Sequence, residues 1–344
     1  MKSLLCFTIS FAALAVSAIT PSDWKHLPDL PNQLGVAGAF AGVSGNSLVV
    51  AGGANFPGRM PWEGGTKKWH DTVWVLDRPD GQWCEAGKLP RPLGYGVSVT
   101  TDRGIICVGG SDIDRHYADV FRLSVINGKA DTMKLPSLPS ALANSCGALV
   151  DSVFYIVGGN EKPGETECVA RAFALDLADV AKGWKEIEKV PGRPRFLCAA
   201  AADNGVLWVV GGATLAENSD GKMERVYLHE VWAYRPGSGW ARHTDMIKPA
   251  VAAPTPAPVI NGRMLVLTGD DGSRRGFQPP DKHPGFARAI QSFDINEEKW
   301  SMAGEMPAGR AVLPCVRWGD HLVIVNGEQR PGVRTPEVLA LPLK

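Results

Sequence analysis

The stretch SLVVAGG, residues 47–53, runs from an apolar segment into a pair of glycines, and it recurs along the chain. Close copies are GIICVGG (104–110), SVFYIVGG (152–159) and VLWVVGG (206–212), and weaker ones are MLVLTGD (264–270) and HLVIVNG (321–327). Successive copies are roughly 50 to 60 residues apart, a period typical of repeats that each form a small four-stranded sheet. The six copies predict six such units.

Each unit carries further strand signals around the glycine pair. A strand of small apolar residues precedes it across a tight polar turn, such as SGNS (44–47) or ADNG (202–205). A longer loop then leads to a third strand, such as DTVWVLD (71–77), and a tryptophan usually marks the fourth. Those tryptophans are Trp83, Trp184, Trp240 and Trp300, and the second unit has Met133 near the expected place. The pattern predicts an all-β fold, a six-bladed β-propeller of the Kelch type.

The two ends of the repeat region complement each other. The last unit stops after a third strand that ends near Leu343, whereas the segment SDWKHLPDLP (22–31) places Trp24 in the fourth-strand pattern. We therefore expect the N-terminal strand to complete the last blade, which closes the ring without an open sheet edge. One propeller domain then occupies residues 19–344.

The first residues have the pattern of a secretory signal peptide. Lys2 supplies a basic start, residues 4–16 are apolar, and Ser17 and Ala18 form a small-residue cleavage site. The apolar run is shorter than the ~20 residues that span a bilayer, and no later segment is long and apolar enough. We therefore expect residues 1–18 to be removed, a mature chain from near Ile19 without a membrane span, and a periplasmic or secreted location.

Composition argues against several partners and cofactors. The 36 basic residues balance the 36 acidic ones, so a nucleic-acid partner is not expected. The cysteines beyond the signal peptide are widely spaced, without a CxxC pair or a histidine-rich tract, and we expect no metal site. The chain also contains no glycine-rich phosphate loop, and no cofactor is expected. Composition does not predict the oligomeric state.

Long loops after the glycine strands should share one face of the propeller with the segments that lead into the next blade. That face carries Arg91, Asn144, Arg195 and Arg310, each just before or at the start of an innermost strand. Arginines at one mouth suit an anionic ligand, because a guanidinium binds a carboxylate through two parallel hydrogen bonds. The alternative is that they tie the blades together through carbonyl and carboxylate contacts. Acids that recur at the start of third strands are expected to be structural caps: Asp71, Asp119, Glu230 and Glu337.

Two stretches go beyond a general propeller pattern, AGGANFPGRMPWEGGTKKWHDTVWVLD (51–77) and NGEQRPGVRTPEV (326–338). Together they resemble the N-acetylneuraminate epimerase (sialic acid mutarotase) family, in particular its cyclically permuted branch. In the familiar bacterial members a segment like NGEQRPGVR lies in mid-chain, before segments like GVAGAFAGVSGNSLVVAGG (35–53) and YGVSV (95–99). In this chain the latter segments come first and NGEQRPGVR comes near the end. The resemblance covers nearly the whole ring.

The resemblance implies an isomerase that interconverts the α and β anomers of a sialic acid by opening and closing the sugar ring. It implies catalytic roles for Glu328, as proton carrier, and Arg334, as the group that holds the substrate carboxylate. We expect the two to face one another across the mouth, because Pro331 and Gly332 between them favour a turn that folds the loop back, so that both side chains approach one bound sugar. The alternative is that Glu328 merely pairs with Arg330 or Arg334. Asn55, in the first stretch, is expected to contact the substrate together with Arg91, Asn144, Arg195 and Arg310.

Other functions of propellers remain to be weighed against this one. A Kelch propeller that binds a glycan or a protein without catalysis is the main alternative, because the fold alone does not determine the function. A sialidase would carry repeated Ser-x-Asp-x-Gly-x-x-Trp boxes, and the chain has none. A copper oxidase would need clustered tyrosine, cysteine and histidine ligands, which the five tyrosines do not suggest.

Overall fold

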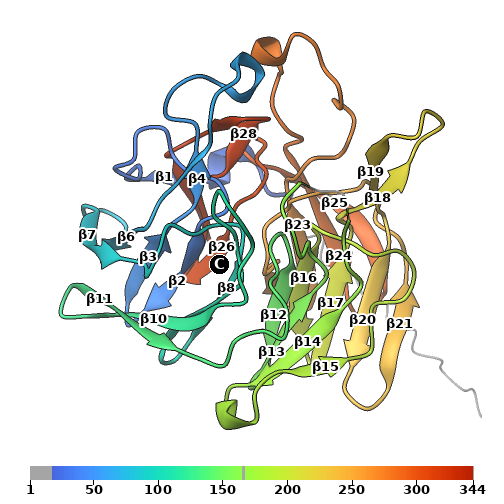
Figure 1. Ribbon diagram of the computed structural model, residues 1–344, viewed down its shortest axis with the longest axis horizontal. Helices are drawn as coiled ribbons and strands as arrows, with labels where there is room; N and C mark the ends of the chain where they lie inside the picture. The colour runs from blue at the N-terminus through green and yellow to red at the C-terminus, as the bar shows by residue number, and fades with distance from the viewer. Residues whose placement is uncertain (1–17, 165–166, 344) are drawn as a thin grey trace, which may run out of the picture.

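Six four-stranded antiparallel sheets form a ring in the computed structural model, which describes residues 18–164 and 167–343 (Figure 1). The chain is therefore the six-bladed β-propeller that its repeat predicts. The expected signal peptide, residues 1–18, lies outside the described residues except for Ala18. In the described part of the chain, no helix has the length and hydropathy needed to cross a membrane.

The blades follow one another in chain order, and their strands are given from the channel outward. The first has β2 (Phe40–Ser44), β3 (Ser47–Ala51), β6 (Thr72–Leu76) and β7 (Cys84–Lys88), and the second has β8 (Val97–Thr101), β9 (Gly104–Val108), β10 (Val120–Ile126) and β11 (Lys129–Lys134). The third has β12 (Cys146–Val150), β13 (Val153–Val157), β14 (Ala172–Asp176) and β15 (Lys185–Ile187), and the fourth has β16 (Ala199–Asp203), β17 (Val206–Val210), β20 (Val231–Arg235) and β21 (Gly239–His243). The fifth has β22 (Val259–Ile260), β23 (Arg263–Leu267), β24 (Ala289–Asp294) and β25 (Lys299–Glu305), and the sixth has β26 (Cys315–Trp318), β27 (His321–Val325), β30 (Val338–Pro342) and β1 (Lys25–Leu27).

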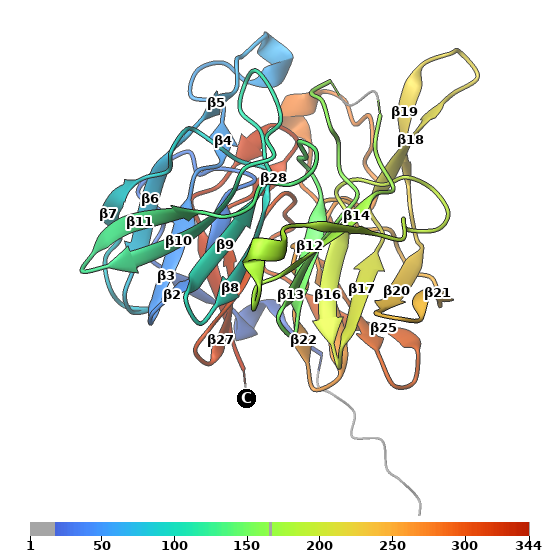
Figure 2. The same ribbon diagram turned by 60° about the horizontal axis from the view of Figure 1, so that its bottom comes forward.

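Three two-stranded hairpins extend the loops on one face, which we call the mouth face (Figure 2). They are β4 (Ala54–Asn55) with β5 (Lys68–Trp69), β18 (Ala213–Glu217) with β19 (Met223–Tyr227), and β28 (Glu328–Arg330) with β29 (Val333–Arg334). Four short 3₁₀ helices complete the described elements: η1 (Pro21–Asp23), η2 (Pro61–Glu63), η3 (Val180–Lys182) and η4 (Pro280–Lys282). The mouth face therefore carries most of the irregular structure.

Burial follows the position of a strand in its blade. All five residues of β9 and of β17 are buried, whereas no residue of the outermost strands β11, β15 and β21 is. Neighbouring blades cover both faces of the inner strands, so these strands appear in the sequence as short continuous apolar runs. The outer strands face solvent and carry the charged residues.

The N-terminal strand closes the ring, as expected. β1 pairs with β30 in antiparallel register, from Lys25 opposite Ala340 to Leu27 opposite Val338. The preceding Trp24 is buried among apolar residues of the fifth and sixth blades. The backbone N–H of Ile19 also donates to the carbonyl of Ala303 at 2.8 Å. The start of the chain therefore holds the last two blades together.

Outer tryptophans join four of the blades to the blade before them. In four blades the indole N–H donates to a backbone carbonyl at the outer edge of the preceding blade, at 2.8 to 2.9 Å. The pairs are Trp83 with Pro28, Trp184 with Pro136, Trp240 with Glu188, and Trp300 with Thr244. The second blade has no such contact, because Met133 stands near the expected place and its side chain is exposed.

A closed ring of six backbone hydrogen bonds surrounds the channel. In each blade, one residue just before the innermost strand donates its N–H to the carbonyl of its counterpart in the preceding blade, at 2.7 to 3.0 Å. The six residues are Gly38, Tyr95, Asn144, Leu197, Ala252 and Val312. All have φ between +53° and +66°, although five of them are not glycine. This left-handed conformation costs of order 1–3 kcal/mol for a residue with a side chain, so the surrounding structure must hold it in place.

Candidate functional site

The hairpin β28–β29 brings Glu328 and Arg334 together at the mouth face. The two residues are direct cross-strand partners. Pro331 and Gly332 make the turn between the two strands, and Gly332 has a φ of +82°, which glycine adopts without a steric penalty. A Cβ on Gly332 would lie 2.6 Å from the side chain of Pro61, so the tip of the hairpin sits tightly against the loop of the first blade.

An ion pair links the two side chains, with Arg334 Nη2 at 2.8 Å from Glu328 Oε1. The arginine side chain is only 2% exposed and the glutamate 16%. The expected turn at Pro331 and Gly332 folds the loop back and brings the two groups face to face, as neighbours on one hairpin rather than on opposite sides of the mouth. The alternative, in which Glu328 pairs with Arg334, describes the observed geometry.

Contacts with the first and second blades fix the guanidinium of Arg334. Its Nε donates to the carbonyl of Ala54 at 3.3 Å, and its Nη2 donates to the hydroxyl of Tyr95 at 3.4 Å. Its Cζ lies 4.7 Å from the ring centroid of Phe56, a cation–π distance. Nη1 is buried and has no hydrogen-bond partner among the described residues. A buried donor without an acceptor is costly, so this guanidinium has an unused capacity for one more oxygen.

Lys67 adds a second cation beside Arg334. Its Nζ lies 4.8 Å from the ring centroid of Tyr95, 5.2 Å from that of Trp69 and 5.9 Å from that of Phe56. Within the described part of the chain Lys67 has no carboxylate partner. Lys67, Arg334 and Glu328 therefore give this corner of the mouth an excess of one positive charge, which favours a ligand with one negative charge.

Sequence reasoning missed Lys67 and the aromatic rings around it. Lys67, Phe56 and Trp69 lie within the stretch 51–77 that carries the resemblance, in or beside an irregular loop where no periodicity marks a functional position. Tyr95 was also missed, since only its place in the ring of backbone hydrogen bonds brings its hydroxyl to Arg334. A usable signal was the density of aromatic and basic residues in the loop after the first glycine pair.

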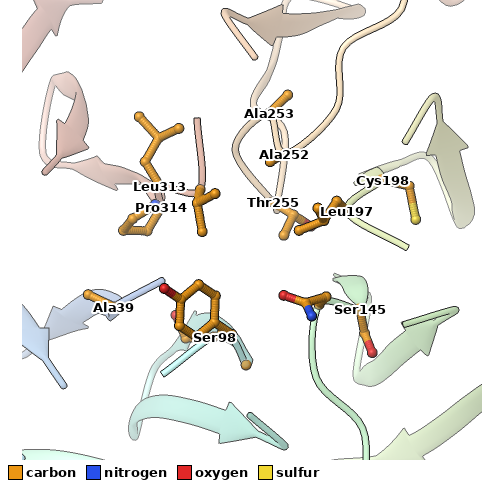
Figure 3. Close-up of a pocket in the computed structure, with 14 residues that line it drawn as sticks. Ala39, Ser98, Ser145, Leu197, Cys198, Ala252, Ala253, Thr255, Leu313 and Pro314 are labelled. Atoms are coloured by element: carbon orange, nitrogen blue, oxygen red, sulfur yellow. The ribbon is translucent and has the colours of Figure 1, made fainter. Parts of the chain in front are cut away.

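The channel below the mouth is narrow. At the level of the backbone ring its cavity has a volume of about 50 Å³, and residues from all six blades line it (Figure 3). Tyr95 and Asn144 line it at the level of the backbone ring, and Asn144 Nδ2 donates to Asn160 Oδ1 at 3.2 Å. A space of this size holds a few waters, because each needs of order 10–15 Å³ of such volume. A sugar is too large for this space, and the predicted contact with Asn144 stays a prediction.

The residue after each glycine strand occupies an equivalent place at the mouth, where a backbone bridge ties it to the segment that leads into the innermost strand of the same blade. Glu328 has this place in the sixth blade, and its counterparts are Ala54, Ser111, Asn160, Ala213 and Asp270. Asp270 accepts a hydrogen bond of 2.6 Å from the hydroxyl of Tyr227. Across the described residues, no group of three or more histidine, cysteine, aspartate or glutamate side chains is placed to hold a metal ion.

The three arginines expected to bind substrate are paired with acids of their own blades instead. Arg91 lies 3.3 Å from Asp119, and an equivalent ion pair joins Arg195 to Glu230. In the sixth blade Arg310 pairs in the same way with Glu337 and donates to the carbonyl of Asn326. Arg195 and Arg310 have no exposed surface, so the prediction that they contact a sugar needs correction. They tie the channel segment to the third strand, which is the alternative function considered for them. Arg91 keeps 38% exposure at the rim.

Asn55 also has a structural position. Its side chain is buried, Nδ2 donates to the carbonyl of Gly35 at 2.8 Å, and Oδ1 lies 2.9 Å from His70 Nε2. Burial lowers the pKa of His70, which favours the neutral ring in this contact. The expected substrate contact of Asn55 is therefore corrected to a link between the first loop and the N-terminal segment.

Comparison with solved structures supports the fold. A solved structure of YjhT superposes with a TM-score of 0.66 over 91% of this chain and 96% of that chain, at 16% sequence identity. At this identity the match bears on the fold alone, and it agrees with the propeller described above.

Comparison with sequences finds similarity to one family over part of the chain. The N-acetylneuraminate epimerase family profile matches residues 13–132. Relatives named N-acetylneuraminate epimerase include one from Yersinia pestis (strain Pestoides F), 44% identical over 26% of each chain. One from Haemophilus influenzae (strain 86-028NP) is 41% identical over 60% of this chain and 59% of the relative. The matches thus span between about a quarter and three fifths of these relatives' length.

Proposed function

We propose that this chain, which is related to the N-acetylneuraminate epimerases, interconverts the α and β anomers of N-acetylneuraminic acid or a related sialic acid. The observation that carries the proposal is the pair Glu328 and Arg334, held on one hairpin at the mouth with a buried guanidinium nitrogen left without a partner. The names of the relatives support the same reaction.

The substrate carboxylate is the natural ligand for the two cations. Arg334 keeps Nη1 without an acceptor while Nη2 holds Glu328, so one donor remains for a second carboxylate; this nitrogen is buried, and the side chains that cover it must move for a substrate to reach it. Lys67 supplies a further positive charge. The rings of Phe56, Trp69 and Tyr95 give the apolar face of a sugar a surface to pack against. A neutral sugar would lack the group that these cations recognise.

Glu328 is the proposed proton carrier. Its carboxylate takes the proton of the anomeric hydroxyl, the bond between the anomeric carbon and the ring oxygen breaks, and the ring oxygen receives a proton. The product is the open-chain keto acid. Rotation about the adjacent carbon–carbon bond and closure by the reverse steps yield the other anomer. Arg334 steadies the negative charge that develops beside the substrate carboxylate. Apart from opening and closing the sugar ring, the reaction transfers only protons.

Proton NMR of freshly dissolved crystalline sialic acid tests this proposal directly. The protein should speed the approach of the two anomer signals to their equilibrium ratio, and no new product should appear. A propeller that binds a glycan without catalysis would leave the rate at its spontaneous value. Release of sugar from a sialoside would indicate a hydrolase instead.

We further propose that the protein is exported, with a cleaved signal peptide at residues 1–18 and a periplasmic or secreted mature form. The basic start, apolar run and small residues before Ile19 support this. The backbone of Ile19 also joins the fifth blade, so the fold makes use of the chain from the expected cleavage point onward. The propeller at residues 19–344 would then belong to the mature protein.

A further inference from the structure

Two cysteines meet where the third and fourth blades touch beside the channel. Cys146 is the first residue of β12, and Cys198 lies immediately before β16 and lines the channel cavity (Figure 3). Their Sγ atoms are 3.1 Å apart, and the two residues are 0% and 1% exposed. Because sulfurs in a disulfide lie about 2.05 Å apart, a shift of about 1 Å separates this pair of thiols from a covalent bond.

The backbone ring around the channel holds the two segments together. The N–H of Leu197 donates to the carbonyl of Asn144 at 2.8 Å, as one of the six bonds of that ring. Cys198 directly follows Leu197, and Cys146 is two residues after Asn144. A disulfide forms without backbone movement only where the two segments are already close. The ring bond provides this proximity as soon as the two blades are side by side.

The other blade joints show what this place requires. Between the first and second blades the equivalent residues are Phe40 and Gly96, and a Cβ on Gly96 would lie 2.5 Å from the ring of Phe40. Between the fourth and fifth blades they are Ala199 and Ala253, which share one apolar cluster. A buried cysteine can also serve simply as a small apolar side chain. At the third and fourth blades, however, both places hold cysteine, and two thiols in contact can be oxidised.

We propose that Cys146 and Cys198 form a disulfide that links the third blade to the fourth beside the channel. The oxidant is a small disulfide such as oxidised glutathione. The thiolate of one cysteine attacks a sulfur of the oxidant and releases one glutathione thiolate, which leaves a mixed disulfide. The thiolate of the other cysteine attacks the protein sulfur of this mixed disulfide and releases the second glutathione. Two protein thiols are thus oxidised, and the two glutathione thiolates take up the protons that they lose.

Burial determines when the bond forms. An oxidant reaches both sulfurs before the blades close, so the bond forms during folding and is afterwards shielded from reductants. Disulfides persist in oxidising compartments, and in the organism this one therefore rests on the proposed export of the protein. It does not depend on the proposed isomerase activity.

Peptide mapping of protein that folds in the presence of the oxidant provides the test. The full chain is synthesised in a cell-free reaction that contains a glutathione redox buffer, free thiols are blocked with N-ethylmaleimide in urea, and the protein is digested without reduction. Mass spectrometry should find a peptide with Cys146 linked to one with Cys198. Trypsin leaves Cys146 and Cys168 in one peptide, so a second protease that cleaves after Glu161 separates them.

Thermal unfolding gives a second measurement. Protein made with the redox buffer should melt about 3–6 °C above protein made with reduced glutathione alone, because a bond between residues 52 positions apart restricts the unfolded chain. Cys146→Ser should abolish this difference. Cys107→Ser, at another buried cysteine, is the matched control and should retain it.

Two outcomes of the peptide map would overturn the proposal. One is the recovery of both Cys146 and Cys198 as blocked thiols from folded protein made with the redox buffer. The other is a link from either residue to a different cysteine, such as Cys168. The cell-free reaction involves no export and the map involves no sugar, so failure of the export proposal or of the isomerase proposal would be visible separately.

Discussion

Replacing Glu328 with glutamine removes a carboxylate while keeping the length of the side chain and one oxygen for Arg334. In the structure this oxygen accepts from Nη2 at 2.8 Å, and the amide carbonyl of glutamine can do the same. A hydrogen bond between charged groups contributes ~1.5–3 kcal/mol and one with a neutral partner ~0.5–1.5 kcal/mol, so the variant should lose about 1 kcal/mol of stability. Typical domains have stabilities of ~5–15 kcal/mol, and the variant should remain folded.

The same change should lower the rate of anomer exchange far more than it lowers stability. Loss of a general acid–base group typically costs ~10²-fold or more in rate, which corresponds to about 2.7 kcal/mol in the barrier. Binding of sialic acid should survive, since Arg334 and Lys67 remain. The assay is the NMR time course of fresh sialic acid, with Glu161→Gln as control, a rim glutamate that pairs with Arg171. Wild-type exchange by Glu328→Gln would refute the role of this carboxylate.

Three further predictions follow from the same geometry. Arg334→Ala should weaken sialic acid binding by about 10- to 150-fold, measured by calorimetry, and Arg334→Lys should restore only part of it because an ammonium lacks the planar fork; equal binding of a sugar without a carboxylate would contradict this. Trp24→Ala should lower the free energy of unfolding in urea by about 3–5 kcal/mol, because this side chain packs between the fifth and sixth blades. An unchanged unfolding midpoint would contradict the role of the N-terminal segment in closing the ring. Mass spectrometry of exported protein should find an N-terminus near Ile19, and a secreted chain that retains Met1 would exclude the signal peptide.

The number of blades was predictable because the end of each second strand requires a glycine: the backbone there has a positive φ and no room for a Cβ. The second glycine of each copy has a positive φ, for example +84° at Gly53 and +81° at Gly212. A Cβ at Gly212 would lie 2.7 Å from the backbone of Cys198, in the adjacent segment of the same blade. Such a requirement recurs in every blade and so leaves a periodic trace in the sequence. The closing strand could be predicted from the same pattern, since Trp24 supplied the missing fourth-strand signal.

The site was less predictable, because a charged residue does not reveal its partner. Arg195 and Arg310 have the residue type and the place that an anion site requires, yet Glu230 and Glu337 neutralise them within their own blades. The recurring acids at the third strands carried that information, and pairing each with the arginine of its own unit would have shown it. For Lys67 the sequence offered a weaker signal, the density of aromatic and basic residues in its loop, since only the fold of that long loop brings it over the ring of Tyr95.

The ring of backbone hydrogen bonds around the channel has no first or last member. The bond between Gly38 and Val312, which lie far apart in the chain, is formed in the same way as the bond between Asn144 and Tyr95. A break in the polypeptide between any two blades would leave all six bonds intact, provided that the two ends met again within one sheet, as β1 and β30 do. The blade at which the chain begins is therefore independent of the arrangement of the blades around the propeller axis. In a chain of this architecture the N- and C-termini can lie in a different blade while the residues at the mouth keep their positions.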